Sequence, residues 1–363
     1  SVCMNRQGYF DEETRMKNDK PMPSKSRRSV MLAGALSATG ALALGVPAAA
    51  SRAQALKRVN VGMQPIVNGP IYIAIREKYF EKLGIDLNLV KFTSGPAQFA
   101  ALAGGQIDLA WGGMGAFLLA KANGQDLNFI SVFMDYNPLE ALVVPAGSPV
   151  RSVKDLAGRK VGLVTGSDAH YGMVRAMQAN RMDKGSVTLL GMAPPQQIAA
   201  LQSGDVDALY LWEPFLTPLY EKGARPLLRL SDLDPGSAFL GWAGKRAWLE
   251  ANADVIEKIL KGWDMGLKRM REEPGLAVRY TMEFTGMQAA QAQAILKGLG
   301  HFGATDAVDP ASPVHWAKGS PLNRVMHDFI AFGKEQGLVK PEVEVDVDGY
   351  VMTRFMKAAA QGR

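Results

Sequence analysis

Two short segments of this 363-residue chain carry residues suited to enclosing an organic molecule. One segment is Trp212 and Glu213, and the other is Gly112, Gly113 and Met114. An aromatic face beside backbone that glycine leaves accessible is typical of a pocket that buries a small ligand. Simpler interpretations stay open, since two glycines can form a tight turn and Glu213 could pair with a neighbouring cation.

Two other segments place hydroxyl and backbone N–H groups at the start of predicted helices. They comprise Thr93, Ser94 and Gly95, and Gly166, Ser167 and Asp168 with His170 just beyond. The positive end of a helix dipole and its free N–H groups favour a bound anion. Ser94 and Asp168 equally suit helix capping without a ligand, and His170 equally suits a helix end or the surface.

The turn after the first predicted strand supplies further candidates. We expect ligand contacts from Gln64, Asn68, Gly69, Thr93, Ser94, Gly95, Gly113, Met114, Ser167, Asp168, His170, Trp212 and Glu213, with Asp135, Tyr136 and Asn137 as weaker candidates. Unpaired carboxylates at Asp135, Asp168 and Glu213 would repel an anion in a low-dielectric pocket. They favour a neutral, zwitterionic or amine-bearing solute.

A repeat indicates which elements position these residues. Residues 96–108 return 99 residues later as 195–207, with seven of thirteen positions identical. Each copy reads as a helix opened by proline, closed by glycine and followed by a short apolar strand. The repeat predicts two similar lobes that present 112–114 and 212–213 to one cleft, unless the match between alanine-rich helices is a coincidence.

Strand and helix patterns alternate along the chain, which is typical of an α/β fold. We expect strands over 59–63, 85–92, 107–111, 127–133, 141–144, 160–164 and 187–192, and helices over 69–82, 114–122, 168–180, 252–271, 287–299, 321–336 and 349–360, with a loop over 301–320. Trp111 lies within a strand and suits core packing. Turn-rich breaks near 145 and 236 predict a first lobe of 54–145 and 237–363, a second lobe of 146–236, and a two-strand hinge.

The first 53 residues have the pattern of an export signal. Two arginines at 27 and 28 precede an uncharged stretch over 30–46, and small residues follow at 47–50. These features predict a cleaved, twin-arginine-like signal peptide with leader, although the basic residues equally suit the general secretory route. A retained N-terminal anchor is the alternative, but the apolar run is short for a membrane span.

Charge and cysteine usage exclude several functions for the chain after residue 53. That part holds 33 basic and 31 acidic residues, so its net charge is only about +2 and indicates no nucleic-acid partner. The sole cysteine, Cys3, belongs to the signal, which leaves no disulfide, thiolate metal site or thiol nucleophile. We expect a soluble periplasmic protein and a monomer, with no cofactor, no metal and no catalytic residues.

Five segments in order resemble the nitrate/sulfonate/taurine group of ABC-transporter substrate-binding proteins, and the chain is also similar to the NMT1/THI5-like domain. They are residues 69–86, 101–108, 153–162, 166–170 and 212–214. The resemblance implies a bilobal type II periplasmic-binding-protein fold that delivers a small solute, such as a sulfonate, taurine or a related acid, to an ABC permease in the inner membrane. It also leaves pyrimidine or thiamine precursors and aromatic acids open as solutes.

Two other functions stay open on this fold. A ligand-sensing protein would share the architecture, because a fold alone does not separate transport from sensing. Pyrimidine synthases resemble the same family, but that resemblance implies functional cysteines, which the chain lacks after residue 53. The sequence also has no paired-histidine zinc helix, P-loop or nucleophile elbow, so we expect a binding protein rather than an enzyme.

Overall fold

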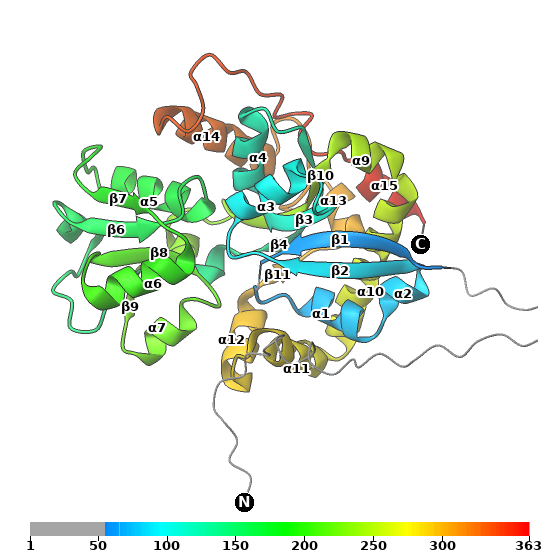
Figure 1. Cartoon of the computed structure of the whole chain (residues 1–363), viewed down its shortest axis with the longest axis horizontal. Coiled ribbons are helices and arrows are strands. Elements are labelled where there is room, and N and C mark those ends of the chain that lie inside the picture. Colours follow the sequence, from blue (N-terminus) through cyan, green and yellow to red (C-terminus); the bar gives the residue numbers. More distant parts are fainter. Residues whose placement is uncertain (1–54, 65, 363) are drawn as a thin grey trace, which may run out of the picture. The chain divides into compact units, whose positions relative to one another are not determined.

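Two separate β-sheets organise the residues that the computed structural model describes, 55–64 and 66–362; the predicted signal peptide lies outside them (Figure 1). The first sheet has the order β11 (Gly300–His301), β4 (Leu127–Asp135), β10 (Phe239–Lys245), β3 (Leu109–Gly113), β1 (Lys57–Met63) and β2 (Ile85–Lys91). The second has the order β7 (Thr188–Gly191), β6 (Lys160–Leu163), β8 (Ala208–Trp212), β5 (Glu140–Val144) and β9 (Arg225–Arg229).

The two sheets share one topology. In the first, β2, β1 and β3 are parallel neighbours, and antiparallel β10 lies between β3 and β4. In the second, β7, β6 and β8 are parallel neighbours, and antiparallel β5 lies between β8 and β9. In each sheet, the antiparallel strand is the first strand after the chain crosses over from the other sheet. This shared arrangement confirms the predicted pair of similar α/β units.

The first crossing lies earlier than we predicted. We placed a strand over 141–144 before the crossing, but β5 pairs with β8 and β9 of the second sheet, so that placement was wrong. The chain crosses instead through Tyr136 and the short helix η2 (Asn137–Leu139). All five residues of β5 are buried, and an uninterrupted buried run does not indicate which sheet it joins. The division into hinged lobes stays a prediction.

Both copies of the repeat form a helix and then a strand, as predicted. Helix α3 (Gly95–Ala103) leads to β3, and α6 (Pro194–Ser203) leads to β8. The repeated aspartates have equivalent structural roles: Asp108 accepts a hydrogen bond from the Asn60 N–H at 2.8 Å, and Asp207 accepts one from the Lys160 N–H at 2.9 Å. Each aspartate ties the start of its strand to the adjacent parallel strand.

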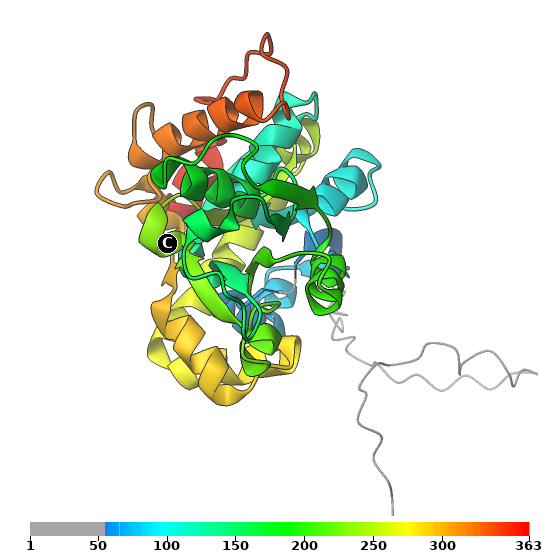
Figure 2. The ribbon, with the colours of Figure 1, turned by 90° about the vertical axis from the view of Figure 1, so that its left-hand side faces the viewer.

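The remaining helices before β10 accompany these two sheets. The predicted helix over 69–82 is divided into α1 (Gly69–Arg76) and α2 (Tyr79–Lys82), because Lys78 has a left-handed backbone with φ 58° that ends the first helix. The others are α4 (Met114–Ala122), η3 (Val153–Leu156), α5 (Asp168–Ala179), α7 (Thr217–Glu221) and α8 (Leu230–Leu233). Figure 2 shows the second sheet and its green helices from their own side.

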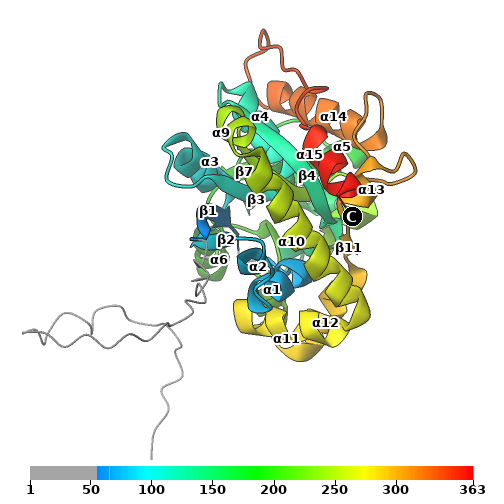
Figure 3. The same ribbon diagram turned by 90° about the vertical axis from the view of Figure 1, so that its right-hand side faces the viewer.

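The chain after β10 is mainly helical, as predicted. Its helices are α9 (Arg246–Ala251), α10 (Ala253–Glu272), α11 (Pro274–Thr285), α12 (Ala289–Gly298), α13 (Ala304–Val308), α14 (Pro321–Glu335) and α15 (Arg354–Gln361). Figure 3 shows α10 beside α1. They approach closely because of Gly266, where an added Cβ would lie 2.2 Å from the Pro70 carbonyl oxygen. Helix α11 was not predicted, and the predicted loop over 301–320 contains α13.

Candidate functional site

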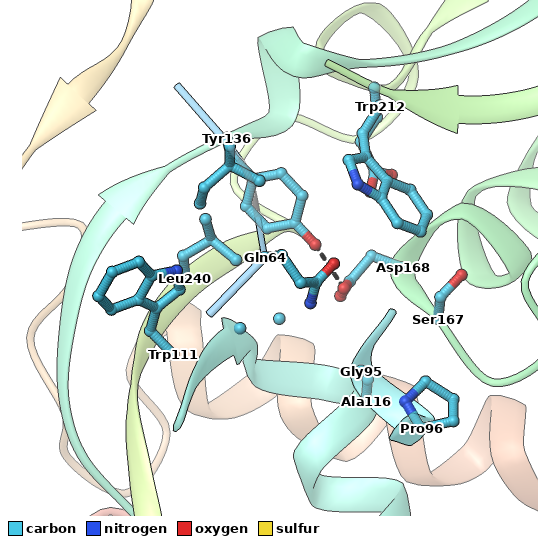
Figure 4. A pocket seen from close by; sticks show the side chains of 14 residues that line it. Gln64, Gly95, Pro96, Trp111, Ala116, Tyr136, Ser167, Asp168, Trp212 and Leu240 are labelled. Atoms are coloured by element: carbon cyan, nitrogen blue, oxygen red, sulfur yellow. Dashed lines mark hydrogen bonds between the residues drawn. The ribbon is translucent and has the colours of Figure 1, made fainter. Parts of the chain in front are cut away.

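A cavity lies between the two sheets and takes its walls from both (Figure 4). Fourteen residues line it: Gln64, Ile66, Gly95, Pro96, Trp111, Gly112, Gly113, Ala116, Tyr136, Glu140, Ser167, Asp168, Trp212 and Leu240. Its volume is about 30 Å³. Since a water molecule needs roughly 10–15 Å³ on this scale, the cavity in this conformation is too small for an organic solute.

The strand ends explain why these residues meet. Gln64 follows the carboxyl end of β1, Gly113 is the last residue of β3, and Trp212 is the last residue of β8. Ligands of open α/β sheets bind outside the carboxyl ends of the parallel strands. Gly95 and Asp168, the first residues of α3 and α5, complete this arrangement at helix N-termini.

Contacts on both flanks of the cavity hold the two halves together. On one flank, the rings of Tyr171 in α5 and Phe329 in α14 stack with centroids 4.7 Å apart, and the Lys184 Nζ donates to the Glu335 carbonyl oxygen at 2.6 Å. On the other, the Gln291 Nε2 of α12 donates to Glu221 Oε1 of α7 at 2.9 Å. The conformation is therefore closed around the small cavity.

Two acids and a tyrosine form the polar centre of the cavity. The Tyr136 hydroxyl donates a hydrogen bond to Asp168 Oδ2, which Figure 4 shows as a dashed line. Glu140 begins β5 and is only 1% exposed, and Asp168 is 4% exposed. Glu140 Oε2 and Asp168 Oδ1 are buried without a hydrogen-bond partner among the described residues.

Burial raises the pKa of both acids, and repulsion from Asp168 adds to the rise for Glu140. For Glu140, burial and then the nearby charge of Asp168 raise the pKa well above its ordinary value. Burial raises the pKa of Asp168 to about 6, although the hydrogen bond from Tyr136 lowers it. A carboxyl group near a second carboxylate resists ionisation, so the pair holds a proton more readily than isolated acids do.

The cavity wall carries no basic side chain among the described residues: of its fourteen members, Glu140 and Asp168 are the only ionisable acids, and none is Lys, Arg or His. Gln64 contributes an amide and is 8% exposed. The aromatic rings of Trp111, Tyr136 and Trp212 form part of the apolar wall, together with Ile66 and Leu240. The lining residues can accept hydrogen bonds and stabilise a positive charge. They include no positively charged side chain that could pair with an anion.

Six of the thirteen predicted ligand residues come together here, and their role in binding stays a prediction: Gln64, Gly95, Gly113, Ser167, Asp168 and Trp212. Ser167 also caps α5, since its hydroxyl accepts a hydrogen bond from the His170 N–H at 3.4 Å. Trp212 lies at the end of β8 opposite Gly113 at the end of β3, as the repeat predicted.

Three others of the thirteen pack within the first half of the fold. Gly69 contacts α10 and α11, where an added Cβ would lie 2.8 Å from the Ala277 Cβ and 2.9 Å from the Met270 sulfur. Met114 is fully buried, and its carbonyl accepts a hydrogen bond from the Tyr350 hydroxyl. Asn68 is also fully buried, and its amide has no partner among the described residues.

The remaining four also lie outside the cavity lining. Thr93 is exposed, and Ser94 is buried at the start of α3. His170 packs against Phe332 with ring centroids 5.1 Å apart, and burial lowers its pKa to about 4. Glu213 accepts a hydrogen bond from the Thr217 N–H at 3.0 Å, while burial raises its pKa. None of these four lines the cavity.

Glu140 is the principal residue that sequence reasoning missed. We took the strand to begin at 141, so the acid appeared to belong to a loop. An acid directly before a buried apolar strand is a signal that could have identified it. Tyr136 was among our weaker candidates and lines the cavity. Trp111 packs in the core as expected, with its ring centroid 5.3 Å from that of Trp242, but it also lines the cavity.

Comparison with known proteins places this architecture in a family. The family model described as "NMT1/THI5 like" matches residues 67–277, more than half of the chain. The chain belongs to the NMT1/THI5-like family. The matched region contains every lining residue except Gln64 and Ile66, so the cavity is essentially within it.

Several relatives of this NMT1/THI5-like protein are named as binding proteins. The taurine-binding periplasmic protein of Escherichia coli (strain K12) is 28% identical over 89% of this chain and 100% of its own length. The putative aliphatic sulfonates-binding protein of Bacillus subtilis (strain 168) is 26% identical over 84% of this chain and 89% of its own. The alkanesulfonate-binding protein SsuA from Xanthomonas axonopodis pv. citri bound to MOPS has the same fold, with a TM-score of 0.67 at 21% identity over 80% of this chain and 97% of its own.

Metal-binding clusters and membrane-spanning helices are both absent from the described residues of this NMT1/THI5-like protein. These residues contain no group of three or more His, Cys, Asp or Glu side chains placed to hold a metal ion. None of the helices within 55–64 and 66–362 combines the length and the apolar character needed to cross a membrane.

Proposed function

We propose that this chain is the periplasmic solute-binding component of an ABC importer and captures a small organic solute in the cavity between its two sheets. The observation that carries the proposal is a cavity with walls from both sheets, at the carboxyl ends of β1, β3 and β8. Relatives named for taurine and aliphatic sulfonates support it. An inner-membrane permease is the partner that this function requires.

The size of the cavity implies that the two halves separate to admit a solute. Small-molecule sites measure about 300–1,000 Å³, far above the 30 Å³ seen here. Within the part of the chain that the structure describes, two segments connect the halves, around residues 136–139 and 234–238. Rotation at a few backbone torsions in such crossings opens a cleft without disturbing either sheet.

A melting screen tests the proposal. The protein without its first 53 residues is heated with taurine, alkanesulfonates, nitrate, aromatic acids, pyrimidines and small amines. A solute at 100 times its dissociation constant should stabilise the native state by about 2.7 kcal/mol. For a chain of this size that corresponds to a rise in melting temperature of roughly 4 °C.

The variant Trp212→Ala provides the control for the site. It should remove most of the shift, because Trp212 forms one wall of the cavity. Trp248→Ala, which changes a tryptophan of α9 outside the cavity, should retain the shift. No shift with any solute would contradict the proposed function, and equal shifts in wild type and Trp212→Ala would place the solute elsewhere.

A further inference from the structure

Two buried carboxylate oxygens point to the chemistry of the solute. Glu140 and Asp168 line the cavity and are 1% and 4% exposed, and Glu140 Oε2 and Asp168 Oδ1 have no hydrogen-bond partner among the described residues. A buried acceptor left unpaired is destabilising, and more so when it is charged. Such an acceptor facing a cavity is satisfied when a ligand brings a donor to it.

The donor that best suits the site carries a positive charge. The cavity wall holds two acids and, within the described chain, no basic residue. A sulfonate or carboxylate group placed beside Glu140 and Asp168 would face like charge in a low-dielectric site, whereas a cation would relieve the repulsion between them. The rings of Tyr136 and Trp212 also line the cavity and attract cations through their faces.

We infer that the solute carries a protonated nitrogen, as an amine or amidine, and that this group binds between Glu140 Oε2 and Asp168 Oδ1. The inference rests on the proposed function and assigns the recognised group of its solute. The two free oxygens provide two acceptors for N–H donors, and Tyr136 already occupies the other oxygen of Asp168. The remainder of the solute faces the apolar wall formed by Ile66, Trp212 and Leu240.

The inference also bears on the relatives named for sulfonates. Taurine has both an ammonium and a sulfonate group, so its amine would occupy the acidic end of this cavity. Isethionate has a hydroxyl in place of that amine and lacks the positive charge. Comparing the two therefore separates recognition of nitrogen from recognition of the sulfonate.

Matched probes test the inference by isothermal titration calorimetry at pH 7.5. The pairs are taurine with isethionate and benzylamine with benzyl alcohol, and benzenesulfonate is the anionic comparator. We expect a nitrogen-bearing probe to bind at least tenfold more tightly than its nitrogen-free partner, since a hydrogen bond between charged groups is stronger than one between neutral groups. Benzenesulfonate should not bind.

Isosteric variants show which carboxylates bind the amine probe. Glu140→Gln and Asp168→Asn should each weaken the amine probe tenfold or more, because each removes a carboxylate and keeps the shape. Glu213→Gln is the matched control, since Glu213 is a buried acid outside the cavity lining. Glu140→Gln should also melt no lower than wild type without probe, because it removes a buried acid from a repulsive pair.

Proton release distinguishes a binding role from a structural one. A cation favours the ionised acids, so affinity for the amine should rise with pH through about 6, the pKa to which burial raises Asp168, and further through the raised pKa of Glu140. Binding should release protons, seen as a dependence of the calorimetric heat on buffer ionisation, and Asp168→Asn should reduce it. The other groups facing the acids are the hydroxyls of Tyr136, Tyr210 and Tyr350, whose pKa values lie far above this range.

The outcomes separate the inference from the proposed function. Binding of the nitrogen-free sulfonates with no preference for taurine, or unchanged amine binding in both Glu140→Gln and Asp168→Asn, overturns the inference and leaves an importer component that recognises another group. Failure of these probes and of every solute in the melting screen overturns both.

Discussion

At the scale of single residues, Gly113 shows how closely the two halves approach in the closed conformation. A Cβ added there would lie 2.1 Å from Asp168 Oδ2 and 3.0 Å from the Tyr136 hydroxyl oxygen. Gly113 has an extended backbone, with φ −62° and ψ 125°, so alanine fits its conformation and only the contact changes. A substitution at Gly113 therefore tests how closely the two halves approach without changing how β3 folds.

We expect Gly113→Ala to weaken binding of the solute found in the screen by about tenfold or more, because overpacking in a tight contact costs roughly 1–3 kcal/mol. Titration calorimetry measures the effect. The matched control is Gly275→Ala, since an added Cβ there meets no atom within 4 Å. Equal affinities of Gly113→Ala and wild type would show that the solute binds without this approach.

At the scale of elements, one side chain links the two crossing segments. The Asn137 Oδ1 accepts hydrogen bonds from the Ala238 N–H at 3.2 Å and the Ser237 hydroxyl at 3.1 Å. Its Nδ2 donates to the Asp135 carboxylate at 2.6 Å and to the Ala238 carbonyl at 3.3 Å. Asn137 is 1% exposed, so these bonds are shielded from water.

The variant Asn137→Ala should lower the free energy of unfolding by about 2–4 kcal/mol, because it leaves buried groups of both crossings unpaired. Urea unfolding measures the change. Asn252→Ala is the comparison, since Asn252 donates a single local bond, to the Trp248 carbonyl. A loss no greater than that of Asn252→Ala would mean that Asn137 does not hold the crossings together.

At the scale of the whole molecule, contacts on the two flanks of the cavity hold the halves in the closed conformation. Tyr171 stacks on Phe329 on one flank, and Gln291 contacts Glu221 on the other. Tyr171 and Phe329 are 3% and 0% exposed, whereas the Gln291–Glu221 contact is exposed. Separation of the halves therefore exposes apolar surface on the first flank and little on the second. A solute that touches both walls adds contacts that only the closed form makes.

We therefore expect saturating solute to reduce the radius of gyration measured by small-angle X-ray scattering, as the population shifts from open to closed. Trp212→Ala, which removes part of one wall, should show a smaller change at the same solute concentration. A radius that does not change on binding would mean that the halves are already closed in solution, and that the solute reaches the cavity by another route.

Much of the architecture could be predicted from local patterns. The repeat indicated two equivalent helix–strand units, and Gly113 and Trp212 do lie at matching strand ends. Such predictions succeed because alternation of apolar residues, proline at helix starts and glycine at helix ends are local properties. The same patterns led us to the helix N-termini at Gly95 and Ser167, both of which line the cavity.

What the sequence by itself determined is the family of folds, the paired units and roughly half of the cavity wall. Only the tertiary structure decided that Glu140 starts a strand of the second sheet and lies beside Asp168, because strand pairing between distant segments is not a local property. Tertiary packing likewise turned His170 and Glu213 away from the cavity. The charge of the site, and hence the solute that we infer, depends on that non-local pairing.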